Sequence, residues 1–284
     1  MNLRLATADY SFPKLDWEQT LRLARDIQMQ AMDIGLFAGR SHLLPDEVFA
    51  NLAQSASRVV EALRANDLAI ADVFGQPGRA FEENAVNHPD RAVRQRATEF
   101  FHRILEFALR SNAKHVTLLP GVHFPQEPYE DSLKRCVDEL AWRTATAARM
   151  GITFAVEPHI GCITPTPAQA KGLVEKVPGL TLTLDYTHFT YQGIPDSEIE
   201  PLLSCASHFH ARGACKGKLQ ASFKQNVIDY RNVLRAMERA KYSGLVVLEY
   251  VWVDWMGCNE VDNLSETILL RDFLMTSARE GKPE

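Results

Sequence analysis

Short apolar stretches rich in β-branched residues alternate with longer amphipathic stretches along the whole 284-residue chain. Apolar runs of this kind, bounded by turn-forming residues, are typical of buried strands. They predict strands at Leu3–Ala8, Ala31–Phe37, Leu68–Phe74, His115–Pro120, Ile152–Glu157, Leu180–Asp185, Ala206–His210 and Gly244–Glu249.

Between these runs, apolar residues recur at spacings of three and four, which predicts amphipathic helices. One face of segment 94–112 carries Ala97, Phe101, Ile104, Leu105 and Ala108, and one face of segment 131–151 carries Leu133, Cys136, Val137, Leu140 and Ala147. In the second segment, Asp131 is expected as the N-cap and Gly151 as the C-cap. Further helices are expected at Trp17–Gln30, Pro45–Ala65, Pro167–Lys176, Glu198–Ser204, Tyr230–Ala240 and Asp262–Ala278.

Eight strand–helix repeats in a chain of this length predict an α/β fold, a closed (β/α)8 TIM barrel. An open doubly wound sheet is the alternative. That fold usually carries a glycine-rich phosphate turn after its first strand, whereas here the first strand is followed by TADYSFPKLDW. No low-complexity linker divides the chain, so residues 1–284 are expected to form a single domain.

Composition and charge narrow the classes of partner. The net charge is −5 and no long Lys/Arg run appears, which disfavours nucleic acid. No run of 18 apolar residues and no signal-peptide core is present, so no membrane association and a cytoplasmic location are expected. The five cysteines form no C-x-x-C pair and are expected to be packed thiols.

Charged side chains end four consecutive predicted strands. Glu157 ends the fifth, Asp185 the sixth and Glu249 the eighth, while the seventh places His208 and His210 on one side by alternation. Singly, each could cap a helix, pair with an arginine or pack in the core. In a barrel, however, the carboxyl ends of all strands open on one face. Three carboxylates and an imidazole crowded there would repel unless a cation neutralised them.

The set of donors indicates the kind of metal. Three carboxylates and one ring nitrogen, with no thiolate, favour a hard or borderline divalent ion with coordination positions left for substrate oxygens. Mn²⁺ is the expected ion, and Mg²⁺, Co²⁺ and Zn²⁺ are alternatives. The spacing matches no local zinc-finger or H-E-x-x-H pattern, so the site exists only if the barrel forms.

The second half of the chain carries motifs of a known superfamily. They are VEPH with Glu157, LDYTH with Asp185 and His188, FHAR with His210 and Arg212, IDY with Asp229 and Tyr230, and LVVLE with Glu249. On these motifs the chain resembles the xylose-isomerase-like TIM-barrel superfamily, whose sugar isomerases and epimerases include tagatose/psicose 3-epimerases and hydroxypyruvate isomerases. The resemblance is clear from Phe154 to Glu249 and looser in the first half.

Carried over position by position, the resemblance implies four metal ligands, Glu157, Asp185, His210 and Glu249. Glu157 and Glu249 would also be the catalytic acid and base, and His188 and Arg212 would hold substrate oxygens. The implied activity is a divalent-metal-dependent isomerisation or epimerisation of a small sugar or sugar-acid derivative. A proton would be removed next to a carbonyl, through a metal-stabilised enediolate. Related barrels often form dimers or tetramers, so a homo-oligomer is compatible with the resemblance.

Three other functions stay open. A lyase or hydratase acting on a keto-sugar or keto-glycoside would use the same metal and bases. A phosphodiesterase resembling endonuclease IV would need extra histidines at the ends of strands two and three, and the segments DIGLF and ADVFG supply none there. A non-catalytic sugar-binding barrel would be expected to lack one or more of the ligands, and all four are present.

The neighbourhood of Arg212 departs from the sugar epimerases, which usually place the arginine further from the strand-seven histidine. The following loop carries Lys216, Lys218 and Lys224. We expect either a solvated loop or, with Arg212 and Lys216, recognition of a carboxylate, a phosphate or an oxidised sugar. On the other half of the mouth, Tyr10, Phe74 and His123 are expected to contact the substrate. Trp252 and Trp255 would close the pocket or bury a subunit contact.

Overall fold

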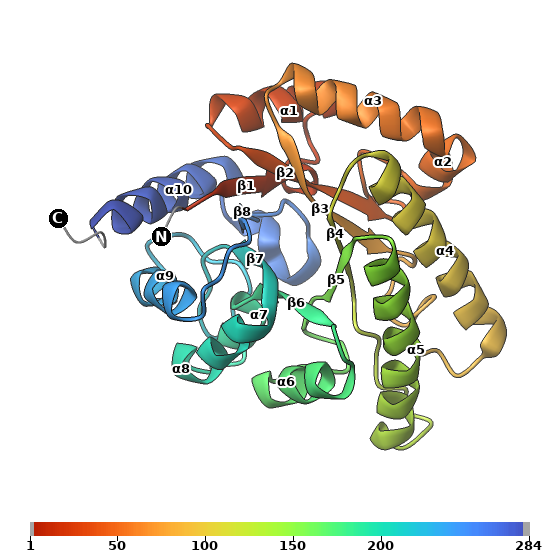
Figure 1. The fold of residues 1–284 in the computed structure, drawn as a ribbon. Coiled ribbons are helices and arrows are strands. Elements are labelled where there is room, and N and C mark those ends of the chain that lie inside the picture. The colour runs from red at the N-terminus through yellow and green to blue at the C-terminus, as the bar shows by residue number, and fades with distance from the viewer. Residues whose placement is uncertain (1–2, 281–284) are drawn as a thin grey trace.

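Eight parallel strands form a closed barrel in a computed structural model that describes residues 3–280 (Figure 1). The strands are β1 (Leu5–Ala8), β2 (Ala31–Phe37), β3 (Ala69–Gln76), β4 (His115–Leu118), β5 (Thr153–Val156), β6 (Thr181–Asp185), β7 (Ala206–Ala211) and β8 (Val246–Leu248). Each strand pairs with the next in the sequence, and β1 also pairs with β8, so that Thr7 lies opposite both Met32 and Leu248. The predicted (β/α)8 fold is confirmed.

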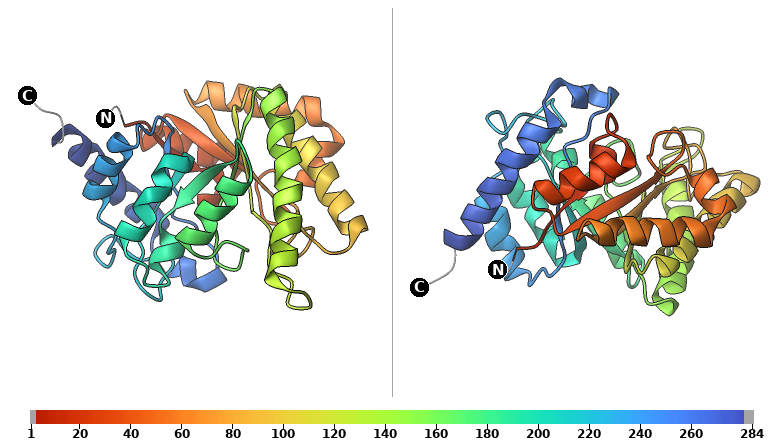
Figure 2. Two further views of the ribbon diagram at one scale, coloured as in Figure 1. Left: turned by 60° about the horizontal axis from the view of Figure 1, so that its bottom comes forward. Right: turned by 90° about the horizontal axis from the view of Figure 1, so that it is seen from above.

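Helices surround the strands in all views (Figures 1 and 2). They are α1 (Trp17–Asp26), α2 (Pro45–Ala50), α3 (Leu52–Ala65), α4 (Arg91–Arg110), α5 (Tyr129–Arg149), α6 (Pro167–Lys176), α7 (Thr187–Thr190), α8 (Asp196–Ile199), α9 (Tyr230–Arg239) and α10 (Asn263–Glu280), with 3-10 helices η1 (Asp9–Ser11), η2 (Glu200–Cys205) and η3 (Trp255–Glu260). The apolar faces of the long helices pack on the outer face of the barrel. Because every crossover brings the chain back in the same direction, the carboxyl ends of all strands lie on one face.

Several helices differ from the sequence prediction. The helix expected at Trp17–Gln30 ends at Asp26, and the one expected at Glu198–Ser204 is divided between α8 and the 3-10 helix η2. The expected helix 45–65 is two helices, α2 and α3, because Asn51 between them leaves the helical region at φ −135° and ψ 55°. The N-cap prediction at Asp131 is wrong. α5 begins at Tyr129 after Pro128, and Asp131 lies in its first turn, where a carboxylate still interacts favourably with the helix dipole. The C-cap prediction is off by one residue: Met150 is the C-cap, and Gly151 follows it with φ +69°.

The interior of the barrel is polar as well as apolar. Asp33 of β2 contacts His208 and His210 of β7, and because β2 and β7 are not neighbours in the closed sheet, these side chains meet across the interior. Thr117 of β4 and Thr183 of β6 also share a hydrogen bond of 2.6 Å across it. Side chains that point inward therefore connect the strands beneath the mouth.

A membrane-spanning helix was not found: no helix within residues 3–280 combines the length and the apolar character that crossing a bilayer requires.

Candidate active site

The four residues predicted to bind a metal lie at the carboxyl ends of β5 to β8. Glu157 and Glu249 directly follow β5 and β8, Asp185 is the last residue of β6, and His210 is the last but one of β7. All four are buried, with at most 5% of the residue surface exposed. Donor atoms of Glu157, His210 and Glu249 lie within 4.8 Å of one another. Three of the four predicted ligands are thus brought together directly.

His210 is the centre of this group. Its Nδ1 lies 2.8 Å from Glu157 Oε1 and 3.4 Å from Glu249 Oε2, and its Nε2 lies 3.0 Å from Asp33 Oδ2. Burial alone would lower the pKa of His210, but the carboxylates of Glu249, Asp33 and Glu157 raise it well above its usual value. The negative charge of Glu157 and Glu249 therefore favours positive charge next to His210 Nδ1.

The two glutamates show the same excess of negative charge. Burial raises the pKa of Glu157 to about 7, with Glu249 adding to the shift and His210 opposing it. Glu249 Oε2 is buried and accepts no hydrogen bond from the described residues. An unsatisfied buried carboxylate oxygen is costly and calls for a partner. Two carboxylates and one imidazole, with no thiolate, fit a divalent cation as that partner.

Asp185 faces a different partner. Its Oδ1 accepts a hydrogen bond of 2.8 Å from the Thr187 backbone N–H, and its Oδ2 accepts one of 2.9 Å from Arg212 Nη2. The same guanidinium nitrogen lies 3.7 Å from Glu249 Oε2. Burial acts to lower the pKa of Arg212, but Asp185 and Glu249 raise it above its usual value. Arg212 thus supplies a positive charge beside the ligand group, and Asp185 lies outside the cluster of three donors.

Above the buried group is a pocket of about 60 Å³ that Glu157 and Glu249 help to line. Four of the residues predicted to contact substrate also line it, namely Tyr10, Phe74, His188 and Arg212. Tyr10, Phe37 and Phe74 form an aromatic wall, in which the ring centroids of Tyr10 and Phe37 are 4.7 Å apart and those of Phe37 and Phe74 are 5.2 Å apart. Such a wall suits the apolar face of a sugar ring.

The other two predicted contact residues, His123 and Lys216, are exposed and do not line this pocket. His123 Nε2 lies 3.1 Å from the backbone oxygen of Glu127 in its own loop. Lys216 lies along Gly193, where its Cδ would be 3.1 Å from an added Cβ. Both residues follow strands that end at the mouth, but their side chains turn to the surface.

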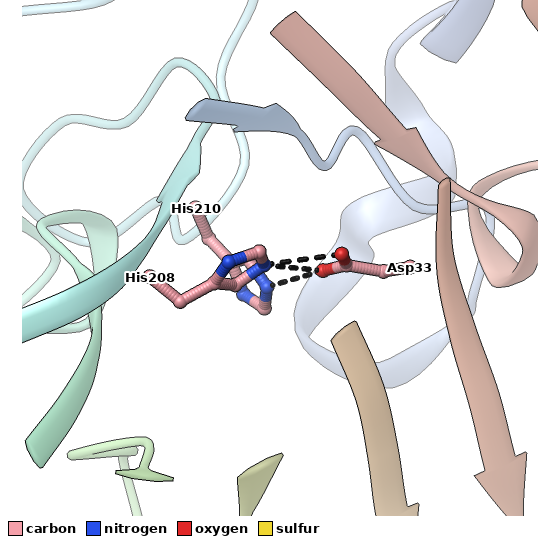
Figure 3. A group of neighbouring side chains, drawn as sticks. All are labelled: Asp33, His208 and His210. Carbon is pink, nitrogen blue, oxygen red and sulfur yellow. Dashed lines mark hydrogen bonds and ion pairs between the residues drawn. The ribbon is translucent and has the colours of Figure 1, made fainter. Parts of the chain in front are cut away.

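Sequence reasoning missed Asp33, the residue that holds His210 from below. Figure 3 shows the Asp33 carboxylate facing the imidazoles of His208 and His210. His208 Nε2 lies 2.9 Å from Asp33 Oδ2 and 3.1 Å from Oδ1. Burial opposes ionisation of Asp33, but His208 and His210 lower the pKa of its carboxyl below the usual value. The available signal was an aspartate in the middle of the buried run AMDIGLF.

Two further residues of the pocket were also missed, Arg40 and His159. The His159 ring centroid lies 3.9 Å from that of His188 and 5.1 Å from that of Trp255, so the three rings form one side of the mouth. Burial lowers the pKa of His159 to about 4. Its position directly after Pro158 in the VEPH motif was a usable signal. Arg40 follows β2 in a loop and carried no motif.

The comparisons with known proteins agree with this architecture. Three solved structures share the fold over nearly the full lengths of both chains. D-psicose 3-epimerase from Clostridium cellulolyticum H10, in complex with D-tagatose, has a TM-score of 0.76 and 15% identity, covering 97% of this chain and 99% of its own. The IolI protein with a bound zinc atom has a TM-score of 0.75 and 16% identity, covering 99% and 100%. The probable 3-DHS dehydratase AsbF from Bacillus anthracis has a TM-score of 0.70 and 13% identity, covering 95% and 99%.

At these identities the likeness is one of fold. Among curated protein sequences, none matches this chain. A protein family does match: residues 21–272 fit the family described as xylose isomerase-like TIM barrel. This range covers most of the chain, including the ends of all strands from β2 to β8. The chain therefore belongs to the xylose isomerase-like TIM barrel family.

Proposed function

We propose that the protein is a divalent-metal-dependent isomerase or epimerase of a sugar or sugar-acid derivative. The observation that carries the proposal is the buried group formed by His210, Glu157 and Glu249 at the base of the pocket, with donor atoms within 4.8 Å of one another. A buried cluster of this charge, opening into a pocket with an aromatic wall, combines a place for a cation with a place for a sugar ring.

The chain's own residues define how a metal would be held. His210 Nδ1, Glu157 and Glu249 offer three donors. Arg212 Nη2 lies 2.9 Å from Asp185 Oδ2, and Asp185 would become the fourth donor once this guanidinium moved away. Asp33, on the opposite nitrogen of His210, fixes the orientation of the ring. Mn²⁺ is the ion that we expect from this donor set. When bound, the cation would supply positive charge to the carbonyl and hydroxyl oxygens of the substrate.

Proton transfer falls to the two glutamates. Glu157 follows β5 and Glu249 follows β8, and these strands are not neighbours in the closed sheet, so the carboxylates reach the pocket from different sides. One carboxylate removes the proton from the carbon next to the carbonyl, and the electron pair moves to the carbonyl oxygen. The other returns a proton to the opposite face of that carbon, which inverts the centre, or to the neighbouring carbon, which moves the carbonyl.

Arg212 and His188 would orient the substrate. The Arg212 guanidinium, released from Asp185, is free to donate hydrogen bonds to substrate oxygens beside the glutamates. His188 faces the same pocket, and its buried Nε2 lies 3.5 Å from Asp185 Oδ2 without a hydrogen bond to the described residues. An unsatisfied ring nitrogen at this place suits a substrate hydroxyl.

A lyase acting on a keto-sugar or keto-glycoside is the second candidate. The similarity in fold to a probable dehydratase favours it, because removal of the same proton can expel a leaving group from the adjacent carbon. Product analysis separates the two: an isomerase returns a compound of unchanged mass, and a dehydratase releases water.

Proton exchange tests the proposal. The metal-loaded protein is incubated in D₂O with a panel of ketoses, keto-acids and 3-keto-glycosides, and deuterium next to the carbonyl is followed by NMR and mass spectrometry. Glu157→Gln and Glu249→Gln should each slow incorporation by about 10²–10⁴-fold. Glu198→Gln, an exposed glutamate of α8, should leave it unchanged. Absence of exchange with every member of the panel would contradict the proposal and favour a phosphodiesterase or a sugar-binding role.

A further inference from the structure

A second cavity adjoins the catalytic pocket on the side of β1 and β2. It has a volume of about 370 Å³, several times that of the inner pocket. Tyr10, Arg40 and Val253 line both, so the two spaces adjoin at these side chains. A substrate whose reacting carbon lies between Glu157 and Glu249 can therefore extend past Arg40 into the outer cavity.

The outer cavity is basic, in contrast to the net charge of −5 of the whole chain. Lys14 and Arg40 line it together with His42, and no Asp or Glu of the described residues does. Within residues 3–280, neither Lys14 nor Arg40 forms an ion pair with a carboxylate. A cavity lined by two cationic side chains and no carboxylate of the described residues is electrostatically favourable for an anion.

Arg40 is held in place by uncharged contacts, and the carboxylates of Glu249 and Glu157 act on its charge only from beyond ion-pair distance. Its guanidinium carbon lies 4.3 Å from the centroid of the Phe37 ring, and its Nη2 donates a hydrogen bond to Gln76 Oε1. Both partners are uncharged. A guanidinium stacked on one face and anchored at one nitrogen keeps further N–H groups for a planar anion, at little additional entropic cost. This arrangement differs from Arg212, whose charge is already paired with Asp185.

We infer that the outer cavity binds an acidic group of the substrate, a carboxylate or a phosphate, and that Arg40 with Lys14 selects acidic sugar derivatives over neutral sugars. The inference rests on the proposed function in one respect, because it takes the reacting carbon of the substrate to lie between Glu157 and Glu249. Arg40 and Lys14 thus take the role expected for Lys216, which is exposed and lies outside both cavities.

Binding of three matched ligands tests the inference. D-fructose, D-fructuronate and D-fructose 6-phosphate carry a hydroxyl, a carboxylate and a phosphate at the same end of one ketose. Trp252, which lines the outer cavity, provides a fluorescence signal for the dissociation constants. In the wild-type protein at least one acid should bind about 10-fold more tightly than D-fructose, the effect of one charge-assisted hydrogen bond. The acid with the larger ratio identifies the group recognised.

Two variants assign the preference to the cavity. Arg40→Gln should bring the ratio of acid to neutral affinity to about 1–2, since one charge-assisted interaction is lost. Lys216→Gln removes the same charge outside both cavities and should retain the ratio. The inference is overturned by a wild-type ratio below about threefold for both acids or by a ratio that survives in Arg40→Gln. It is also overturned if neither acid binds at about 10 mM.

These readouts do not depend on turnover. Deuterium exchange without a preference for acids would leave the proposed function standing and overturn the role of Arg40. A preference for acids that is lost in Arg40→Gln, with no deuterium exchange in any ligand, would support the role of Arg40 and overturn the proposed function.

Discussion

Replacing Asp33 with asparagine removes the charge that holds His210 from the side opposite Glu157. The Asp33 carboxylate accepts from His210 Nε2 at 3.0 Å and from His208 Nε2 at 2.9 and 3.1 Å, with all three side chains buried. Asparagine has one acceptor oxygen, and its NH₂ group would face an imidazole N–H. At least one charge-assisted hydrogen bond is lost, about 1.5–3 kcal/mol. For His210 as a metal ligand, this corresponds to about 10–100-fold weaker metal binding.

Titration calorimetry with Mn²⁺ and Zn²⁺ measures this loss, and Asp72→Asn is its matched control. Asp72 of β3 is equally buried and its Oδ1 lies 2.7 Å from His115 Nδ1, but His115 is not among the proposed ligands. Both variants should be less stable than the wild-type protein, because each loses a buried hydrogen bond to a carboxylate. Only Asp33→Asn should bind metal more weakly. Equal metal affinity in Asp33→Asn and wild type, or an equal loss in both variants, would refute the orienting role of Asp33.

Two further substitutions test the packing beneath Tyr10. Burial raises the pKa of Asp9 to about 7. Between about pH 4 and 7 the folded protein therefore keeps this carboxyl protonated, whereas the unfolded chain ionises it. The free energy of unfolding should fall over this range by up to about 4 kcal/mol. Asp9→Asn should remove that part of the pH dependence in urea titrations, whereas a fall of the same size in the variant would contradict it. Gly35→Ala would place a Cβ 2.5 Å from Tyr10 Cδ1 and should cost about 1–3 kcal/mol. Gly172→Ala, where nothing lies within 4 Å, should be neutral or stabilising, and equal effects of both alanines would contradict the clash.

The strands could be predicted closely because a parallel strand buried on both faces reads as a continuous apolar run. Ala31–Phe37 was predicted with the bounds that β2 has. The break between α2 and α3 could not be predicted in this way. Val48 and Leu52 lie on either side of Asn51 and are both buried, so the apolar spacing is compatible with one helix. The break lies in the backbone of Asn51, at φ −135° and ψ 55°, which the apolar spacing does not encode.

The candidate site was predictable as far as it depends on strand ends. Position at the end of a strand places Glu157 and Glu249 at the mouth, since the barrel makes these ends converge. It does not fix the direction of side chains in the loops beyond, and for that reason Lys216 was assigned to the pocket and Arg40 was not. Asp33 was missed for another reason. Its partner His208 is 175 positions away, and only the closed barrel brings the two together.

The central claim is that the buried group at the ends of β5 to β8 holds one divalent cation. Metal analysis of the purified protein by mass spectrometry tests it most directly, in parallel with Glu249→Gln and Asp185→Asn. We predict about one divalent ion per chain in the wild-type protein and loss of the ion in both variants, since a site of four donors that loses a charged ligand binds far more weakly. Full occupancy in Glu249→Gln, or a wild-type protein that binds no divalent ion even when one is supplied, would contradict the claim.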